Sequence, residues 1–110
     1  MKVKFMNKSR WDHPGDFPTF KMGTHLQLEN EEDINFIGWY ACEITGFNTY
    51  VPKIFVKEGK LTRDYNPTEL IPEIGDILEV KEIVYAWLIV KNEKGIIGWV
   101  PAECVVSINE

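Results

Sequence analysis

The chain has 110 residues, enough for one ordinary domain or two very small ones. Its residues are 45% hydrophobic and 26% charged, a globular composition with enough apolar mass to offset the entropy lost on ordering. The formal net charge of -5 disfavours nucleic acid or an anionic membrane as a partner, because phosphates repel an acidic chain.

The first eight residues carry positive charge but lead into no apolar segment, so they do not resemble a signal peptide. No stretch approaches the roughly 20 apolar residues that span a bilayer. We therefore expect a cytoplasmic protein with no membrane partner.

Short β-strands are predicted along the whole chain. Residues 26–28 and 78–80 alternate apolar with polar side chains, which indicates half-buried strands. Residues 39–44 and 87–90 are apolar runs rich in aromatic or β-branched side chains, and each ends at a turn-forming sequence. Glycine and proline recur too regularly for an amphipathic helix of roughly ten residues. The pattern predicts an all-β fold.

The second half of the sequence repeats the first, with matched residues in one order. The matched pairs are Asp12 and Asp64, Gly23 and Gly75, Leu26 and Leu78, Trp39 and Trp87, Pro52 and Pro101. The offset is 52 residues for the first three pairs, 48 at the tryptophans and 49 at the prolines. It changes only in loop-like places, which is typical of a duplicated module.

Both halves resemble the SH3 domain family. In the second half, residues 62–65 resemble the family's opening ALYDY segment, 69–70 and 75–80 its E-L…G-D-x-L-x-V run, and 95–105 its G-x-x-G-x-x-P-x-N-Y-V segment. Trp87 takes the place of the first tryptophan of the family's WW pair. The first half matches at residues 10–13, Gly23, Trp39 and residues 46–56.

The resemblance implies two tandem SH3-like five-stranded barrels, residues 1–56 and 57–110, packed closely through the short charged link at residues 57–60. Short duplicated proteins of this kind are bacterial in style. The predicted core of the first copy is Leu26, Leu28, Ile44, Val51 and Val56. That of the second copy is Leu78, Val80, Leu88, Val90, Val100 and Val105.

SH3 domains bind proline-rich segments in a groove lined by aromatic side chains, because an extended ligand loses little entropy on docking. The resemblance places the first groove at Trp11, His13, Trp39, Pro52 and Phe55. It places the second groove at Arg63, Tyr65, Trp87, Pro101 and Cys104. Two aromatic positions are missing from the second groove, so the first, centred on Trp39, is the predicted main site.

Two features each allow two interpretations. The carboxylates Glu29, Glu31, Glu32 and Asp33 precede Trp39, where they would favour a basic ligand or simply form a solvated loop. The rings of Trp39 and Trp87 would bind a partner, or would pack against the other barrel.

The two cysteines, Cys42 and Cys104, are predicted to be free thiols. Neither they nor the histidines have metal-ligand spacing, and no nucleotide-binding or hydrolase motif is present. Cys42 aligns with Val90 and is expected in the core. Pairing of Cys104 with His13 or His25 as a nucleophile stays open.

The leading hypothesis is a non-catalytic module, without metal or cofactor, that recognises an extended segment of a partner protein. That segment would be proline-rich or basic. An alternative is a subunit or inhibitor that docks on an enzyme or toxin through a barrel face, and a third is an enzyme that uses Cys104. The identity of the partner and the oligomeric state stay open.

Overall fold

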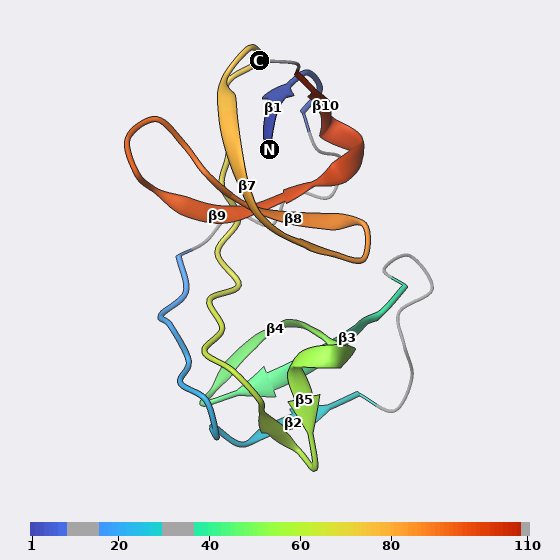
Figure 1. Cartoon of the computed structure of the whole chain (residues 1–110). Helices are drawn as coiled ribbons and strands as arrows, with labels where there is room; N and C mark the ends of the chain where they lie inside the picture. Colours follow the sequence, from blue (N-terminus) through green and yellow to red (C-terminus); the bar gives the residue numbers. More distant parts are fainter. Residues whose placement is uncertain (9–15, 30–36, 109–110) are drawn as a thin grey trace. The chain divides into compact units, whose positions relative to one another are not determined.

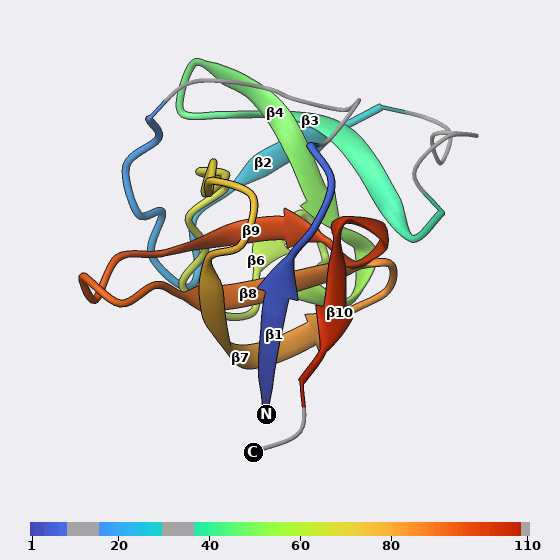
Figure 2. The same ribbon diagram turned by 90° about the horizontal axis from the view of Figure 1, so that it is seen from above.

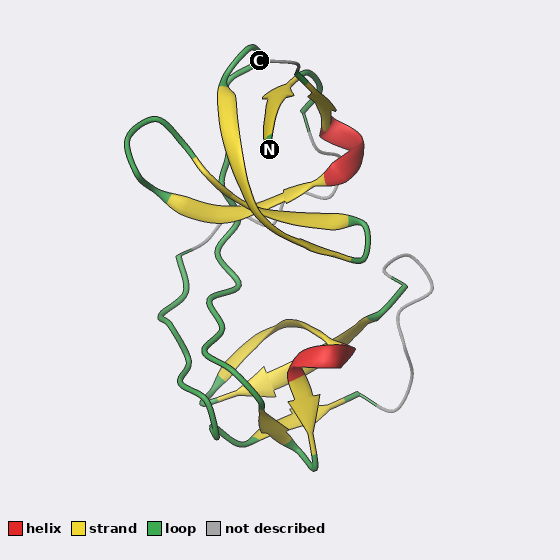
Figure 3. Ribbon diagram, in the orientation of Figure 1, coloured by secondary structure: helices red, strands yellow, loops and turns green. Residues whose placement is uncertain are grey.

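The computed structural model describes residues 1–8, 16–29 and 37–108, and over these residues the fold is all-β, as the sequence predicts. The described residues contain short strands and two 3-10 turns but no α-helix (Figure 3). The elements are β1 (Lys2–Phe5), β2 (Leu26–Leu28), β3 (Trp39–Ile44), β4 (Phe47–Pro52), η1 (Lys53–Phe55), β5 (Val56–Lys57), β6 (Lys60–Leu61), β7 (Ile77–Val84), β8 (Trp87–Lys91), β9 (Ile97–Pro101), η2 (Ala102–Cys104) and β10 (Val105–Ser107). Over the same residues, no helical segment has the length and apolar character needed to cross a membrane.

The chain divides into two compact units (Figure 1). The continuous unit is Phe17–Pro67, and the discontinuous unit combines Met1–Asp16 with Thr68–Glu110. This division differs from the expected domains, residues 1–56 and 57–110, because the N-terminal strand belongs with the second half of the chain.

The pairing of β1 explains this division. β1 lies between β7 and β10 in a five-stranded sheet of order β10-β1-β7-β8-β9 (Figure 2). Its alternating sequence buries Val3 and Phe5, each 3% exposed, while the two lysines of the strand stay exposed. The backbone N–H of Phe5 donates to the carbonyl of Asp76 at 2.9 Å, and the N–H of Gly75 donates to the carbonyl of Phe5 at 2.7 Å. These contacts fasten the N-terminus to the start of β7.

β6 takes the corresponding place in the continuous unit. The N–H of Leu61 donates to the carbonyl of Thr24 at 3.0 Å, and the N–H of Gly23 donates to the carbonyl of Leu61 at 2.8 Å. Thr24 and Gly23 align with Asp76 and Gly75, so these bonds repeat those of Phe5. The two predicted copies therefore exchange their opening strands.

Residues 57–60, expected to link two barrels, instead form a hairpin within one unit. Lys57 pairs with Lys60 across β5 and β6. The two residues between them, Glu58 and Gly59, have positive φ angles of 54° and 74°. Positive φ at both central residues is typical of the type I′ turn, which matches the twist of antiparallel strands. The sequence therefore favours a tight reversal here rather than a linker.

The duplication is visible in the strand register. Trp39 pairs with Pro52 across β3 and β4, and Trp87 pairs with Pro101 across β8 and β9. Each proline precedes a 3-10 turn, with backbone angles of -63° and 134° at Pro52 and -66° and 138° at Pro101. The register confirms the alignment of these residues in the two halves.

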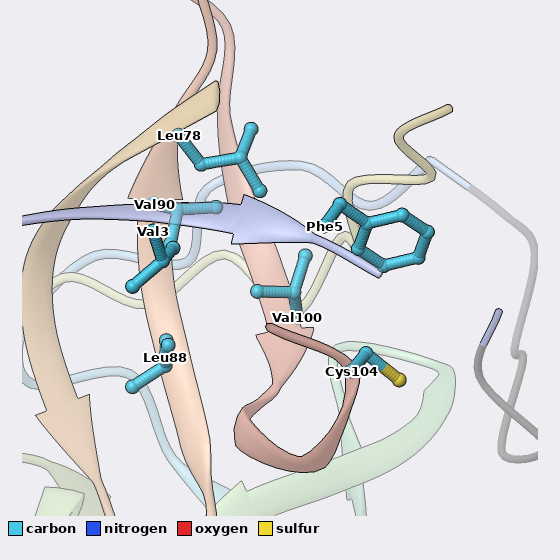
Figure 4. Packing of buried hydrophobic residues seen from close by; sticks show 7 residues of the cluster. All are labelled: Val3, Phe5, Leu78, Leu88, Val90, Val100 and Cys104. Atoms are coloured by element: carbon cyan, nitrogen blue, oxygen red, sulfur yellow. The ribbon is translucent and has the colours of Figure 1, made fainter. Parts of the chain in front are cut away.

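The core of the discontinuous unit contains four of its six predicted residues. The buried cluster consists of Val3, Phe5, Leu78, Leu88, Val90, Val100 and Cys104 (Figure 4). Val80 and Val105 are only partly buried and pack against it. The predicted core lacks Val3 and Phe5, because the sequence pattern places the N-terminal strand in the other copy.

In the continuous unit, Leu26, Ile44 and Val51 are buried as predicted, and so is Cys42. The prediction for Leu28 is wrong, since its side chain is 38% exposed. β2 is a three-residue edge strand, and Leu28 is its last residue. Val56 is half-buried. The core is completed by buried residues outside the predicted core: Phe20, Trp39, Phe55, Leu61 and Tyr65.

The three sheets are open in the described part of the chain. The five-stranded sheet ends at β10 on one side and β9 on the other. The continuous unit has a three-stranded sheet of order β2-β3-β4 and the separate pair β5-β6. Closure into two five-stranded barrels stays a prediction.

The exchange of opening strands is tested by truncating equivalent core residues. Phe5→Ala is expected to lower the free energy of unfolding by about 3–5 kcal/mol, and Leu61→Ala by about 2–5 kcal/mol, because both side chains are buried. Hydrogen exchange should show faster exchange of β7–β9 amides in Phe5→Ala and of β3–β4 amides in Leu61→Ala. Faster exchange in β3–β4 than in β7–β9 for Phe5→Ala would contradict the exchange of strands.

Candidate functional site

The predicted groove residues are divided between the two units differently from expectation. Trp11 and His13 lie outside the described residues. Four others lie in the continuous unit: Trp39, Pro52, Phe55 and Tyr65. Trp87 and Pro101 lie in the discontinuous unit.

Tyr65 joins the residues expected to form the first groove, not those of the second. Its ring meets that of Phe55 edge to face, with centroids 5.6 Å apart and planes at 83°. Its hydroxyl donates to the carbonyl of Tyr50, and the Arg63 guanidinium lies 4.3 Å from the Phe55 ring centroid. The structure therefore places Tyr65 beside residues expected in the first groove, because β6 brings this segment into the continuous unit.

These aromatic rings are covered. Trp39 is 6% exposed, Phe55 2% and Tyr65 3%, and Pro52 is also buried. A ligand can stack only on a ring face that solvent reaches. Their burial favours a structural role for this aromatic set, and it does not favour the first groove as the main site.

A more accessible site lies at the equivalent position in the discontinuous unit. Trp87 is half-buried, and Tyr85, in the turn just before it, is 41% exposed. Pro101 is buried opposite Trp87, and the N–H of Ala102 donates to the carbonyl of Ala86 at 2.9 Å. We call Tyr85, Trp87 and Pro101 the Trp87 corner. Cys104, expected in this groove, belongs to the core instead.

A pocket of about 390 Å³ lies elsewhere on the discontinuous unit, among residues for which the sequence predicts no site. Three segments line it: residues 70–73, 76–77 and 92–96 without Gly95. Two isoleucines at its border, Ile71 and Ile96, are 58% and 54% exposed. The only sequence signal for this pocket is a few apolar residues in loops, such as Ile71 and Ile96. Such residues show no strand or helix periodicity, so the sequence alone does not indicate that they share a site.

The acidic run before Trp39 gives little structural information. Glu29 is exposed, and Glu31, Glu32 and Asp33 lie outside the described residues. Both interpretations of this run stay open.

Asp64 fastens the segment after β6 to the segment before β2. Its Oδ1 accepts the N–H of Met22 at 2.8 Å, and its Oδ2 lies 3.5 Å from Nζ of Lys21. The Met22 hydrogen bond, and then the charge of Lys21, lower the pKa of this exposed carboxyl below its ordinary value. The next residue pair, Phe20 and Tyr65, forms an antiparallel bridge.

Both thiols are buried. Burial raises the pKa of Cys42 to about 12, because a thiolate loses its hydration there. Cys104 is 2% exposed in the core. Among the described residues, no group of three His, Cys, Asp or Glu side chains is placed to hold a metal ion.

Comparison of the chain with protein-family models, with curated proteins and with solved structures found no match.

Alkylation tests the state of the thiols. In the native protein at pH 8, iodoacetamide should label Cys42 and Cys104 far more slowly than in urea, because both are buried. For Cys42 the raised pKa also lowers the fraction of reactive thiolate. Mass spectrometry of timed samples measures both rates. Rapid native labelling of Cys104 would contradict its burial and support the hypothesis of a Cys104 nucleophile.

The Asp64 contact predicts a pH dependence. A lowered native pKa means that the charged carboxylate stabilises the fold above its unfolded pKa of about 3.9, and that this contribution is lost as pH falls through the native pKa. Asp64→Asn should therefore lower Tm at pH 7, and the difference from wild type should shrink below about pH 4. Thermal melts across this range measure it, with Glu43→Gln, which changes an exposed carboxylate on β3, as a control. A difference that does not change with pH would contradict the assignment.

Proposed function

We propose that the chain is a non-catalytic protein-interaction module of two SH3-like barrels that binds an extended segment of a partner protein. The observation that carries this proposal is the repeated pairing of Trp39 with Pro52 and of Trp87 with Pro101, each followed by a 3-10 turn. This is the order in which the SH3 resemblance places the residues of a peptide groove.

The Trp87 corner is the binding site in this proposal. Its tryptophan is half-buried, whereas Trp39 at the equivalent position is buried. The half-buried indole of Trp87 and the exposed ring of Tyr85, two residues before it, offer flat aromatic surface. Such a surface suits an extended chain, which arrives already ordered when it is rich in proline.

The turn between β7 and β8 fixes the backbone of Tyr85. Its φ angle is 55°, a value that residues other than glycine seldom adopt. Val84 and Trp87 pair on the two sides of this turn. The corner is therefore built on a short connection between two strands, which limits the entropy lost when a ligand orders it.

The test is a selection of displayed peptides on the full chain, followed by calorimetric titration of a selected synthetic peptide. Trp87→Ala should weaken binding at least about tenfold, since an aromatic anchor carries much of the energy of such contacts. Val106→Ala removes an exposed apolar side chain from β10 and should leave affinity unchanged. Circular dichroism should show both variants folded.

Equal binding by folded Trp87→Ala and wild type would overturn the proposed site. Loss of binding in a folded Trp39→Phe variant, with Trp87→Ala unaffected, would return the site to the first groove.

A further inference from the structure

The pocket on the discontinuous unit combines an apolar lining with an acidic border. Its apolar residues are Leu70, Ile71, Pro72, Ile77 and Ile96. Its polar residues are Glu73, Asp76, Asn92, Glu93 and Lys94. None of them belongs to the Trp87 corner, so this is a separate surface.

The lining segment formed by residues 70–73, the first wall of the pocket, is hydrogen-bonded to the edge of β9. The N–H of Leu70 donates to the carbonyl of Trp99 at 3.0 Å, and the N–H of Trp99 donates to the carbonyl of Thr68 at 3.2 Å. A Cβ at Gly98 would lie 2.8 Å from the backbone nitrogen of Leu70. Glycine at this position therefore lets the wall approach the sheet.

The other walls are also held by local hydrogen bonds. Oδ1 of Asn92 accepts the N–H groups of Lys94 and Ile96, both at 2.9 Å, which fixes the turn between β8 and β9. Oδ2 of Asp76 accepts the N–H of Glu73 at 3.0 Å, which fixes the turn before β7. The pocket is thus formed before any ligand arrives, and a ligand does not have to order it.

The charges of the lining select the kind of ligand. Glu73, Asp76 and Glu93 carry negative charge against the single positive charge of Lys94, all on exposed side chains. An anionic ligand would be repelled, both here and by the whole chain with its net charge of -5. A cation beside these carboxylates is attracted, while the exposed Ile71 and Ile96 favour an apolar group.

We propose that this pocket binds a segment of a partner protein that carries a lysine or arginine next to an aliphatic or aromatic side chain. The apolar side chain contacts Ile71 and Ile96, and the cation lies against Glu73 and Glu93. Binding here does not use the Trp87 corner, so a partner can engage either surface or both.

The experiment begins with random displayed peptides selected on the full chain. The peptides recovered should combine lysine or arginine with apolar residues, and an amidated synthetic peptide of that sequence should bind in calorimetry. The double variant Glu73→Gln/Glu93→Gln should weaken binding about threefold to tenfold, and Ile96→Ser about tenfold. Binding should also weaken as salt is raised.

Lys94→Gln is the matched control. Lys94 follows Glu93 in the same exposed turn, and its replacement by glutamine removes a positive charge instead of a negative one. Its affinity for the cationic peptide should equal or exceed that of wild type. Damage to the turn would weaken binding in this variant as well, whereas loss of negative charge weakens it only in the glutamate variants.

Several results would overturn the proposal. These are recovery of no peptide, recovery of peptides without basic residues, or unchanged binding by the pocket variants. Loss of binding only in Trp87→Ala would assign the peptide to the proposed groove. Dimerisation of wild type in sedimentation, abolished by Ile96→Ser, would show that a second copy of the chain occupies the pocket.

Discussion

The antiparallel pairing of β1 with β7 and β10 is the interaction on which the discontinuous unit depends. It places Val3 and Phe5 in a core whose other members come from residues 78–104. The continuous unit lies between β1 and β7 in the sequence. Pairing of these two strands therefore closes a loop of more than half the chain. The entropy of such closure grows only slowly with loop length, and a folded insert reduces it because its ends are already near each other. The bridge between Phe20 and Tyr65 holds the two ends of this insert together, so the folded insert shortens the loop that β1 closes.

The sequence predicted the repeated elements well but not their exchange. Trp, Pro and Gly positions fix register and turns locally, and Trp39 with Pro52 pairs as Trp87 does with Pro101. Local sequence does not determine which unit an opening strand joins. Phe5 and Leu61 are both apolar, lie in short alternating strands and make the same two backbone hydrogen bonds in their units. Nothing local distinguishes the two pairings, so only the tertiary arrangement decides between them.

The same limit explains the candidate site. Its place in the chain predicts Tyr65 in the second groove, but β6 brings it to Phe55 and Tyr50. Alignment identified which residues are aromatic, not which rings solvent reaches, so the buried Trp39 was preferred to the half-buried Trp87. The pocket was missed for another reason. Its exposed isoleucines lie in loops, and their proximity arises from backbone bonds between Leu70 and Trp99 that are far apart in sequence.

The pocket and the N-terminal strand are physically coupled. Phe5 donates to the carbonyl of Asp76 and accepts from Gly75, and Asp76 both lines the pocket and fixes its turn through the N–H of Glu73. Undocking of β1 therefore releases one wall. A ligand that binds only the intact pocket must stabilise the docked strand, by about 2.7 kcal/mol at a free concentration one hundred times its Kd. Strand β1 therefore connects the pocket to the core. Phe5 is hydrogen-bonded to Asp76, which lines the pocket, and the side chain of Phe5 packs in the core.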